Sequence, residues 1–212
     1  GVVLQEAFMW RHHPRNKHVQ ELLAAGAIGE LRQIQASFSF DIDRSDWRLD
    51  PARGGGSIWD VGCYGVNGAR LFAGTEPDAI HARAHFHSSG ADLTMHIGLT
   101  FPNQVLAHID CSFEAPYWCQ LELVGTTGTM TLPDAFLPGP QATLLVRRGV
   151  GPESRETPEV ITFTATNQYV DQVNDFCWSI RGGKLLPPGE DGLQQMRVLE
   201  EAQRIARSNR GN

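Results

Sequence analysis

Apolar and polar residues alternate over most of the middle of the chain, which predicts a series of β-strands. The clearest alternation covers residues 31–42, where Ile34, Ala36 and Phe38 point one way and intervening glutamine and serine side chains point the other. The same two-residue period recurs over residues 80–86, 93–101, 105–113, 118–124, 129–132, 143–147 and 159–163. Short links between the first three of these segments predict antiparallel neighbours. The apolar run at residues 2–10 is also predicted to be a strand.

Four other segments show the helical period of apolar positions. The first begins at Pro14, a residue suited to the first turn of a helix, and ends within residues 26–29. The second extends from Ser57 to about residue 72, and Gly74 ends it. The other two helices are predicted over residues 169–180 and 191–208.

These elements predict an α+β fold, with a large, mostly antiparallel open β-sheet and helices packed on one face. The 212 residues are enough for one well-cored domain, and no low-complexity linker divides them. We therefore expect a single α+β domain over residues 1–212. Because each strand is apolar on one side and polar on the other, the polar sheet face is expected to be either hydrated or an interface.

Charge and composition narrow the function classes. The formal net charge is −6 and the pI is about 5.7, which argues against nucleic acid as a partner. No apolar run is long enough to span a bilayer, so no membrane partner is expected. The four cysteines lack C-x-x-C spacing and lie mostly in apolar runs, which is typical of reduced, buried thiols in a cytoplasmic protein.

The predicted helix at residues 57–72 carries the most conspicuous candidate chemistry. Ser57 and Asp60 have the S-x-x-D spacing of a capping box. Asp60 and Tyr64 are four residues apart, so they share one helix face. They could form an acid/base pair, or they could be a capping carboxylate and a packed aromatic residue. Spacing alone favours the second interpretation, because a phenol with a pKa near 10 needs nearby positive charge to act as a base.

Glycines precede this helix and recur within it. Gly62, Gly65 and Gly68 each cost about 0.5–1 kcal/mol relative to alanine, so a backbone or a flat ligand is expected close to their face. The three glycines at residues 54–56 could bind an anion at the helix N-terminus. However, they do not form G-x-G-x-x-G or a P-loop, and no βαβ unit surrounds them. A dinucleotide site built wholly from this chain is therefore not expected.

Two other kinds of site receive weaker support. Five histidines fall on the polar side of neighbouring predicted strands: His81, His85, His87, His96 and His108. No metal-ligand motif accompanies them, so a hydrated or subunit-interface face is favoured and no metal is expected. Paired carboxylates for glycoside hydrolysis, such as Asp50 and Asp60, are a weak alternative.

Several segments, in order along the chain, resemble one enzyme family. They are EAFMWRHHP (residues 6–14), AAGAIGELR (24–32), WRLDPARGGGSIWDVGCY (47–64) and GTTGTM (125–130). Together they resemble the C-terminal domain of Gfo/Idh/MocA oxidoreductases. The tyrosine of D-x-x-x-Y, where inositol dehydrogenases carry histidine, is most similar to the branch with glucose–fructose oxidoreductase, xylose dehydrogenase and dihydrodiol dehydrogenase.

The resemblance implies an NAD(P)-dependent enzyme that acts on a sugar or polyol by hydride transfer. Tyr64 would be the acid/base, with Asp60 as its polar partner. In the family, other matched segments lie near the nicotinamide and the substrate, and they supply further candidates. These are Arg11, Trp47 and Arg48 for binding the cofactor, and His13 and Asn67 for binding the substrate. The resemblance also implies a homodimer or higher homo-oligomer formed through the sheet face.

The chain departs from the family pattern because the N-terminal Rossmann domain is absent. Residues 1–10 are then expected to be the strand leading out of that domain, which would bind most of the NAD or NADP. The glycine face of the helix at residues 57–72 becomes a candidate docking surface for this Rossmann domain. The chain is therefore expected to be an incomplete enzyme, inactive alone. The alternative is a non-catalytic sugar-binding or assembly module with the same fold.

Overall fold

The computed structural model describes residues 2–151, 157–164, 166–184 and 187–210. Within these ranges the chain forms eight strands, β1 (Leu31–Ser39), β2 (Ala79–Phe86), β3 (Asp92–Thr100), β4 (Leu106–Ser112), β5 (Trp118–Gly125), β6 (Gly128–Pro133), β7 (Gln141–Arg148) and β8 (Glu159–Thr164). It also forms four α-helices, α1 (Pro14–Ala24), α2 (Cys63–Ala73), α3 (Gln168–Ile180) and α4 (Gly189–Ser208).

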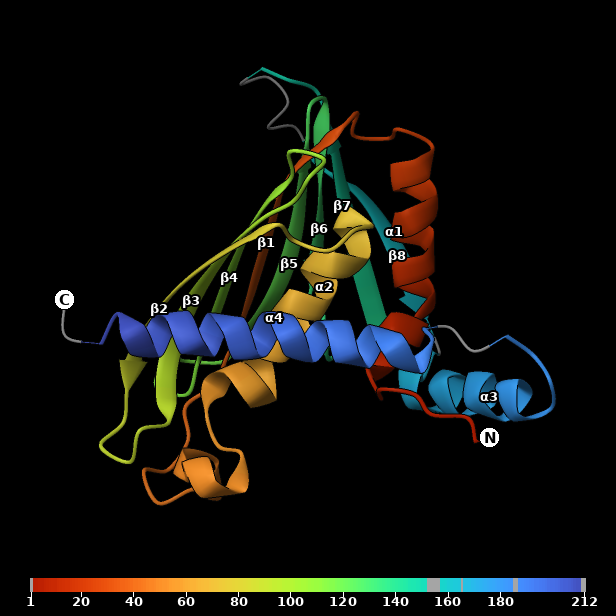
Figure 1. Cartoon of the computed structure of the whole chain (residues 1–212). Helices are drawn as coiled ribbons and strands as arrows, with labels where there is room; N and C mark the ends of the chain where they lie inside the picture. Colours follow the sequence, from red (N-terminus) through yellow and green to blue (C-terminus); the bar gives the residue numbers. More distant parts are fainter. Residues whose placement is uncertain (1, 152–156, 165, 185–186, 211–212) are drawn as a thin grey trace.

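The strands form one open sheet in the order β2-β3-β4-β1-β5-β6-β7-β8 (Figure 1). Every neighbouring pair is antiparallel except β1 and β4, which run parallel with Ile34 opposite Ala107. Strand β1 therefore joins the β2–β4 meander to the β5–β8 meander. The predicted α+β class and mostly antiparallel sheet are confirmed.

The helices cover the apolar face of the sheet in two layers. Helix α2 packs directly on β1 and β4, and the long α4 crosses over α2 to reach β2 (Figure 1). Helix α1 lies by β7, and α3 lies beside a short 3₁₀ turn, η1 (Met9–His12). The central core side chains, among them Ile34, Ile109 and Leu121, are almost completely buried.

The glycines of the α2 segment lie where the helix meets the sheet. A Cβ added to each would meet a buried side chain of the sheet: Gly62 at Cys111 Sγ (2.8 Å), Gly65 at Ile109 Cγ2 (2.5 Å) and Gly68 at Leu121 Cδ1 (2.7 Å). The predicted close approach is confirmed, but the neighbour is the chain's own sheet. The expectation that this glycine face docks another domain is wrong, because β1, β4 and β5 already cover it.

The apolar run at the start of the chain is not a strand. Residues 2–8 have no regular structure, and the backbone then forms η1, with Phe8 N donating to Glu6 O and Arg11 N to Phe8 O. A strand requires a neighbouring strand for its hydrogen bonds, and this segment pairs with none among the described residues. Its end is nevertheless part of the core, since Trp10 is fully buried.

The predicted helix boundaries agree closely with the structure. Pro14 is the first residue of α1, and Gly26 follows its C-terminus with a φ of +70°. Gly74 ends α2 with a φ of +70°, a left-handed conformation that favours glycine. The apolar face predicted for α3, however, is exposed. Three residues of that face, Tyr169, Val173 and Ile180, are each more than half accessible, as are Val170 and Trp178 elsewhere on the helix.

The cysteines are all unpaired. Cys63, Cys111 and Cys119 are buried as predicted, whereas Cys177 is exposed on α3. In the part of the chain that the structure describes, no helix has the length and hydropathy to cross a membrane.

Candidate active site

The segment before α2 is a compact loop built on two aspartate-capped turns. Asp46 accepts from Arg48 N at the turn η2 (Trp47–Leu49), and Asp50 accepts from Ala52 N at η3 (Pro51–Arg53). The amides of the three following glycines all donate to carbonyls of this same loop, at 2.9–3.2 Å. Because these amides are occupied, residues 54–56 do not offer the free N–H groups that a phosphate would bind.

The helical path begins with a π-turn, η4 (Ile58–Gly62), which continues directly into α2. The buried carboxylate of Asp92, at the start of β3, caps this turn. Its Oδ2 accepts from Ser57 Oγ and from Ile58 N, both at 2.7 Å. The predicted capping box is wrong. Ser57 has helical φ and ψ angles and makes no side-chain cap bond, because a carboxylate from a distant strand takes both donors.

Asp60, in the π-turn, forms an ion pair instead of a cap. Arg48 Nε donates to Asp60 Oδ2 at 3.0 Å, and the same guanidinium lies 4.8 Å from the ring centroid of Trp47. The ion pair joins the loop to the π-turn, and the cation–π contact with Trp47 orients the guanidinium within the loop. The side chains of Trp47, Arg48, Trp59 and Asp60, with the three glycines, line a small cavity of about 80 Å³. The loop thus brings the three predicted residues Trp47, Arg48 and Asp60 together.

Tyr64 lies in the first turn of α2 and is half-buried among aromatic rings. Its ring is 5.5 Å from Phe8, 5.8 Å from Phe38 and 5.5 Å from Phe136, measured between centroids. Its hydroxyl donates to Met9 Sδ at 3.6 Å, a weak acceptor.

The surroundings of Tyr64 keep its phenol protonated. Burial raises the Tyr64 pKa well above its ordinary value, and the neighbouring acidic groups, including Asp60, add to the effect. Among the described contacts of the hydroxyl there is no cation. In this environment the phenol is a proton donor, and it needs an added positive charge before it can accept a proton near neutral pH.

The other predicted site residues are engaged within the chain. Arg11 pairs with Asp191 at 2.7 Å, and fully buried Asn67 accepts from Trp10 Nε1 at 3.1 Å. His13 caps α1, since its Nδ1 accepts from Arg15 N. Burial, reinforced by the Arg15 charge, lowers the His13 pKa to about 4, so the ring is neutral.

The sequence did not single out the aromatic wall around Tyr64 or the support beneath it. Phe136 comes from the loop after β6, which carried no signal. Met9 and Phe8 lie in the segment taken for a strand, although their place in the matched EAFMW run was a usable clue. Gln195 of α4 binds the α2 backbone at Cys63, which is more than a hundred residues earlier in the sequence. The apolar pattern of a helix does not predict such a contact.

Two of the five histidines predicted on the polar sheet face pair with neighbouring carboxylates. His96 contacts Asp110 at 2.9 Å, and His85 contacts Glu114 at 2.7 Å. Over the described ranges, no three His, Cys, Asp or Glu side chains are grouped as metal ligands would be.

Comparison with known proteins adds an independent observation to this geometry. The family model described as GFO/IDH/MocA C-terminal domain matches residues 16–131, more than half of the chain. The chain belongs to the Gfo/Idh/MocA family. The matched segment contains the Arg48–Asp60 pair, Tyr64 and Asp92, so the site lies within the region that defines the membership.

Curated members of the family match nearly the whole chain. The D-xylose 1-dehydrogenase (NADP(+)) 2 of Haloferax volcanii is 32% identical over 204 residues, which are 94% of this chain and 61% of that protein. The dTDP-3,4-didehydro-2,6-dideoxy-alpha-D-glucose 3-reductase of Streptomyces antibioticus is 30% identical, covering 98% of this chain and 63% of its own length. The chain therefore spans somewhat less than two thirds of these relatives.

Solved structures of the family have the same fold. The 3-ketoreductase KijD10 from Actinomadura kijaniata, in complex with NADP and TDP-benzene, aligns with a TM-score of 0.86 and 26% identity, covering 96% of this chain and 62% of that one. The aldose-aldose oxidoreductase from Caulobacter crescentus, complexed with glycerol, aligns with a TM-score of 0.84 and 27% identity over the same shares.

Proposed function

We propose that this chain is the substrate-binding and catalytic part of an NAD(P)-dependent oxidoreductase that transfers a hydride to or from a sugar, polyol or related alcohol. The observation that carries the proposal is Tyr64. Among the described residues its protonated hydroxyl has only a weak thioether partner, and it lies in an aromatic wall on the same helical segment as Asp60, the partner of Arg48. The activities of the relatives, on xylose, deoxysugar nucleotides and aldoses, support the substrate class.

The residues of this chain fit only one end of a nicotinamide dinucleotide. The three loop glycines have no free amides for phosphate, whereas the accessible parts of the Tyr64 and Trp47 rings provide an apolar surface of the kind that a flat ring packs against. The Phe8, Phe38 and Phe136 rings are buried and support Tyr64 from behind. We therefore propose that NAD or NADP is held mainly by a separate N-terminal Rossmann domain, which the greater length of the relatives supports. When bound, the nicotinamide supplies or accepts the hydride.

Tyr64 carries out the proton transfer of the reaction. For reduction, its hydroxyl donates a proton to the substrate carbonyl oxygen as negative charge develops there. The raised pKa of Tyr64 keeps the phenol protonated before the reaction, although it also makes the phenol a weaker acid. For oxidation, the same oxygen accepts the proton of the substrate alcohol. This direction requires a cation near Tyr64, and the cation must come from outside the described contacts of its hydroxyl.

The remaining site residues orient the reacting groups. Arg48, fixed by Asp60 and Trp47, presents a positive charge beside the start of α2, where it can contact an oxygen-rich ligand. Arg11, His13 and Asn67 are proposed to act at the edge of the site. Contact with substrate would require each to exchange a hydrogen bond that it now makes to Asp191, Arg15 or Trp10.

The polar face of the sheet supports a proposal about assembly. It carries two histidine–carboxylate pairs, and no helix of the described chain covers it. We propose that this face forms a homodimer or larger homo-oligomer. The unpaired cysteines are in keeping with a reducing compartment such as the cytoplasm.

A hydride-transfer assay on the complete gene product tests this function. The protein is incubated with D-xylose, other aldoses and polyols in the presence of NAD⁺ or NADP⁺, and the reduced nicotinamide is measured. We expect deuterium from C1-deuterated substrate to appear in the reduced cofactor, and we expect no turnover by the 212-residue chain alone. Sugar binding without cofactor reduction by the complete protein would favour the non-catalytic module instead.

A further inference from the structure

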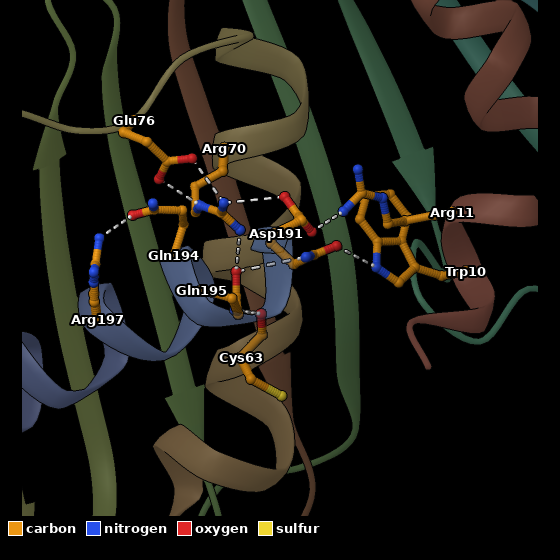
Figure 2. Close-up of polar contacts among 10 residues, drawn as sticks. Trp10, Arg11, Cys63, Arg70, Glu76, Asp191, Gln194, Gln195 and Arg197 are labelled. Carbon is orange, nitrogen blue, oxygen red and sulfur yellow. Dashed lines mark hydrogen bonds and ion pairs between the residues drawn. The ribbon is translucent and has the colours of Figure 1, made fainter. Parts of the chain in front are cut away.

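Gln195 is a buried amide at the centre of a polar network that ties α4 to α2 and to η1. Only 2% of its surface is exposed. Its Nε2 donates to the carbonyl oxygen of Cys63 at 2.8 Å, and its Oε1 accepts from Arg70 NH1 at 2.9 Å and lies 3.5 Å from Asn67 Nδ2 (Figure 2). All three contacts are with α2, so one side chain of α4 fixes α2 through both its backbone and its side chains.

The first of these contacts acts on the residue immediately before Tyr64. Cys63 joins the π-turn to α2, where the backbone hydrogen-bond spacing changes. The position of the Tyr64 side chain depends on how the backbone turns at this junction. The Gln195 amide therefore holds the peptide whose rotation would move the Tyr64 hydroxyl.

A second route leads from Gln195 to the only hydrogen-bond partner of that hydroxyl among the described residues. Asn67, next to Gln195, accepts from Trp10 Nε1 and so fixes η1. Met9, the residue before Trp10, places its Sδ 3.6 Å from the Tyr64 oxygen. The two routes constrain opposite ends of the Tyr64 environment, namely its backbone and its hydroxyl partner.

Charge explains why a neutral amide occupies this position. Arg70 is already paired with Glu76 at 2.7 Å and with Asp191 at 3.1 Å, and Asp191 also binds Arg11 (Figure 2). Arg70 therefore needs only a neutral acceptor from Gln195. A carboxylate there could still bind Arg70, but it would lack the N–H that reaches the Cys63 carbonyl and would repel that oxygen.

We propose that Gln195 is a positioning residue for Tyr64, acting through the Cys63 peptide and through the Asn67–Trp10–Met9 route. The catalytic part of this statement rests on the proposed role of Tyr64. Holding a reacting group within a fraction of an ångström is what such a contact contributes, because a 1 Å misplacement costs on the order of 100-fold in rate.

The test measures the position of Tyr64 separately from turnover. The complete protein is labelled with 3-fluorotyrosine, and the ¹⁹F resonance of residue 64 is assigned as the one lost in Tyr64→Phe. We expect Gln195→Met to shift or broaden this resonance more than any other. Gln194→Met makes the same chemical change one residue away. Among the described residues the Gln194 side chain bonds only Arg197 of its own helix, so this variant should leave the Tyr64 resonance unmoved. Val146→Ala, which truncates a buried side chain of β7, is a destabilised control and should also leave the Tyr64 resonance unmoved.

Gln195→Glu separates the two functions of the amide and is available if Gln195→Met folds poorly. It keeps an acceptor for Arg70 but loses the donor to the Cys63 carbonyl. The Tyr64 resonance should therefore move, while the melting temperature falls less than in Gln195→Met. In turnover, we expect about a 10-fold lower kcat for both Gln195 variants, with KM changed less than about 2-fold.

An unmoved Tyr64 resonance in folded Gln195→Met and Gln195→Glu would overturn the proposal and leave Gln195 as a purely structural residue. The proposed function fails in a different way. If Tyr64→Phe retained full turnover while the Gln195 variants still displaced the resonance, Gln195 would still position Tyr64, but Tyr64 would not be the acid/base.

Discussion

Gly65→Ala tests whether the α2 glycines exist to let the helix approach its own sheet. The added methyl would lie 2.5 Å from Ile109 Cγ2 and 3.4 Å from Ala36 Cβ. Carbon atoms in favourable contact are about 3.5–4.0 Å apart, and both neighbours are buried in central strands, so α2 must move outward. Overpacking of this kind costs about 1–3 kcal/mol, and alanine returns about 1 kcal/mol through its helix propensity.

The expected net loss in the free energy of unfolding is therefore about 0–2 kcal/mol, or up to about 8 °C in melting temperature for a domain of this size. Denaturant titration measures it. Gly68→Ala meets the flexible end of Leu121 and should cost less. In the double variant with Ile109→Ala, which removes the colliding atom, we expect a loss smaller than the sum of the single losses by about 1 kcal/mol. A stabilised Gly65→Ala protein, or strict additivity with Ile109→Ala, would refute the reasoning.

Three further predictions concern buried polar groups. Asp92→Ala leaves the Ser57 hydroxyl and the Ile58 amide without their acceptor, so the free energy of unfolding should fall by about 2–4 kcal/mol. A loss below about 1 kcal/mol in a denaturant titration would argue against Asp92 as the cap. The His13 pKa is about 4 in the folded protein and 6.5 in the unfolded chain, so the unfolded chain binds more protons between these two pH values. The free energy of unfolding should therefore fall by about 3 kcal/mol from pH 7 to pH 4. His13→Gln should flatten this part of the stability profile, and an unchanged slope would contradict the pKa assignment. Arg15 donates to four backbone carbonyl oxygens, so Arg15→Met should lower the free energy of unfolding by about 3 kcal/mol. An unchanged free energy of unfolding would mean that water replaces the guanidinium.

The regular elements were predictable because their signals are local. Alternation identified the strands, and Pro14 and Gly74 marked helix ends correctly. The sheet order was not predictable in the same way. Strand β1 inserts between β4 and β5 through pairings that span some 70–90 residues, and no local pattern specifies them. The run at residues 2–10 had a strand-like pattern but no partner strand.

At the site, sequence analysis found groups but not their partners. It placed Asp60 and Tyr64 on one helical segment, yet it assigned the cap to Ser57 because Asp92 is distant in sequence and close only in the fold. It identified the glycine spacing but not the surface that the glycines face. The role of Gln195 depends on a tertiary contact between two helices and therefore leaves no trace in either helical pattern.

Turnover by Tyr64→Phe in the complete protein is the most direct test of the proposed chemistry. The substitution removes one hydroxyl whose only bond within the described ranges is a weak one to Met9 Sδ, so the fold and the melting temperature should be retained. We expect kcat to fall by about 10²–10⁴-fold in Tyr64→Phe, and the unchanged melting temperature is the control for folding. A Tyr64→Phe enzyme with a kcat within about 2-fold of the unmodified protein would contradict the assignment of Tyr64 as the acid/base.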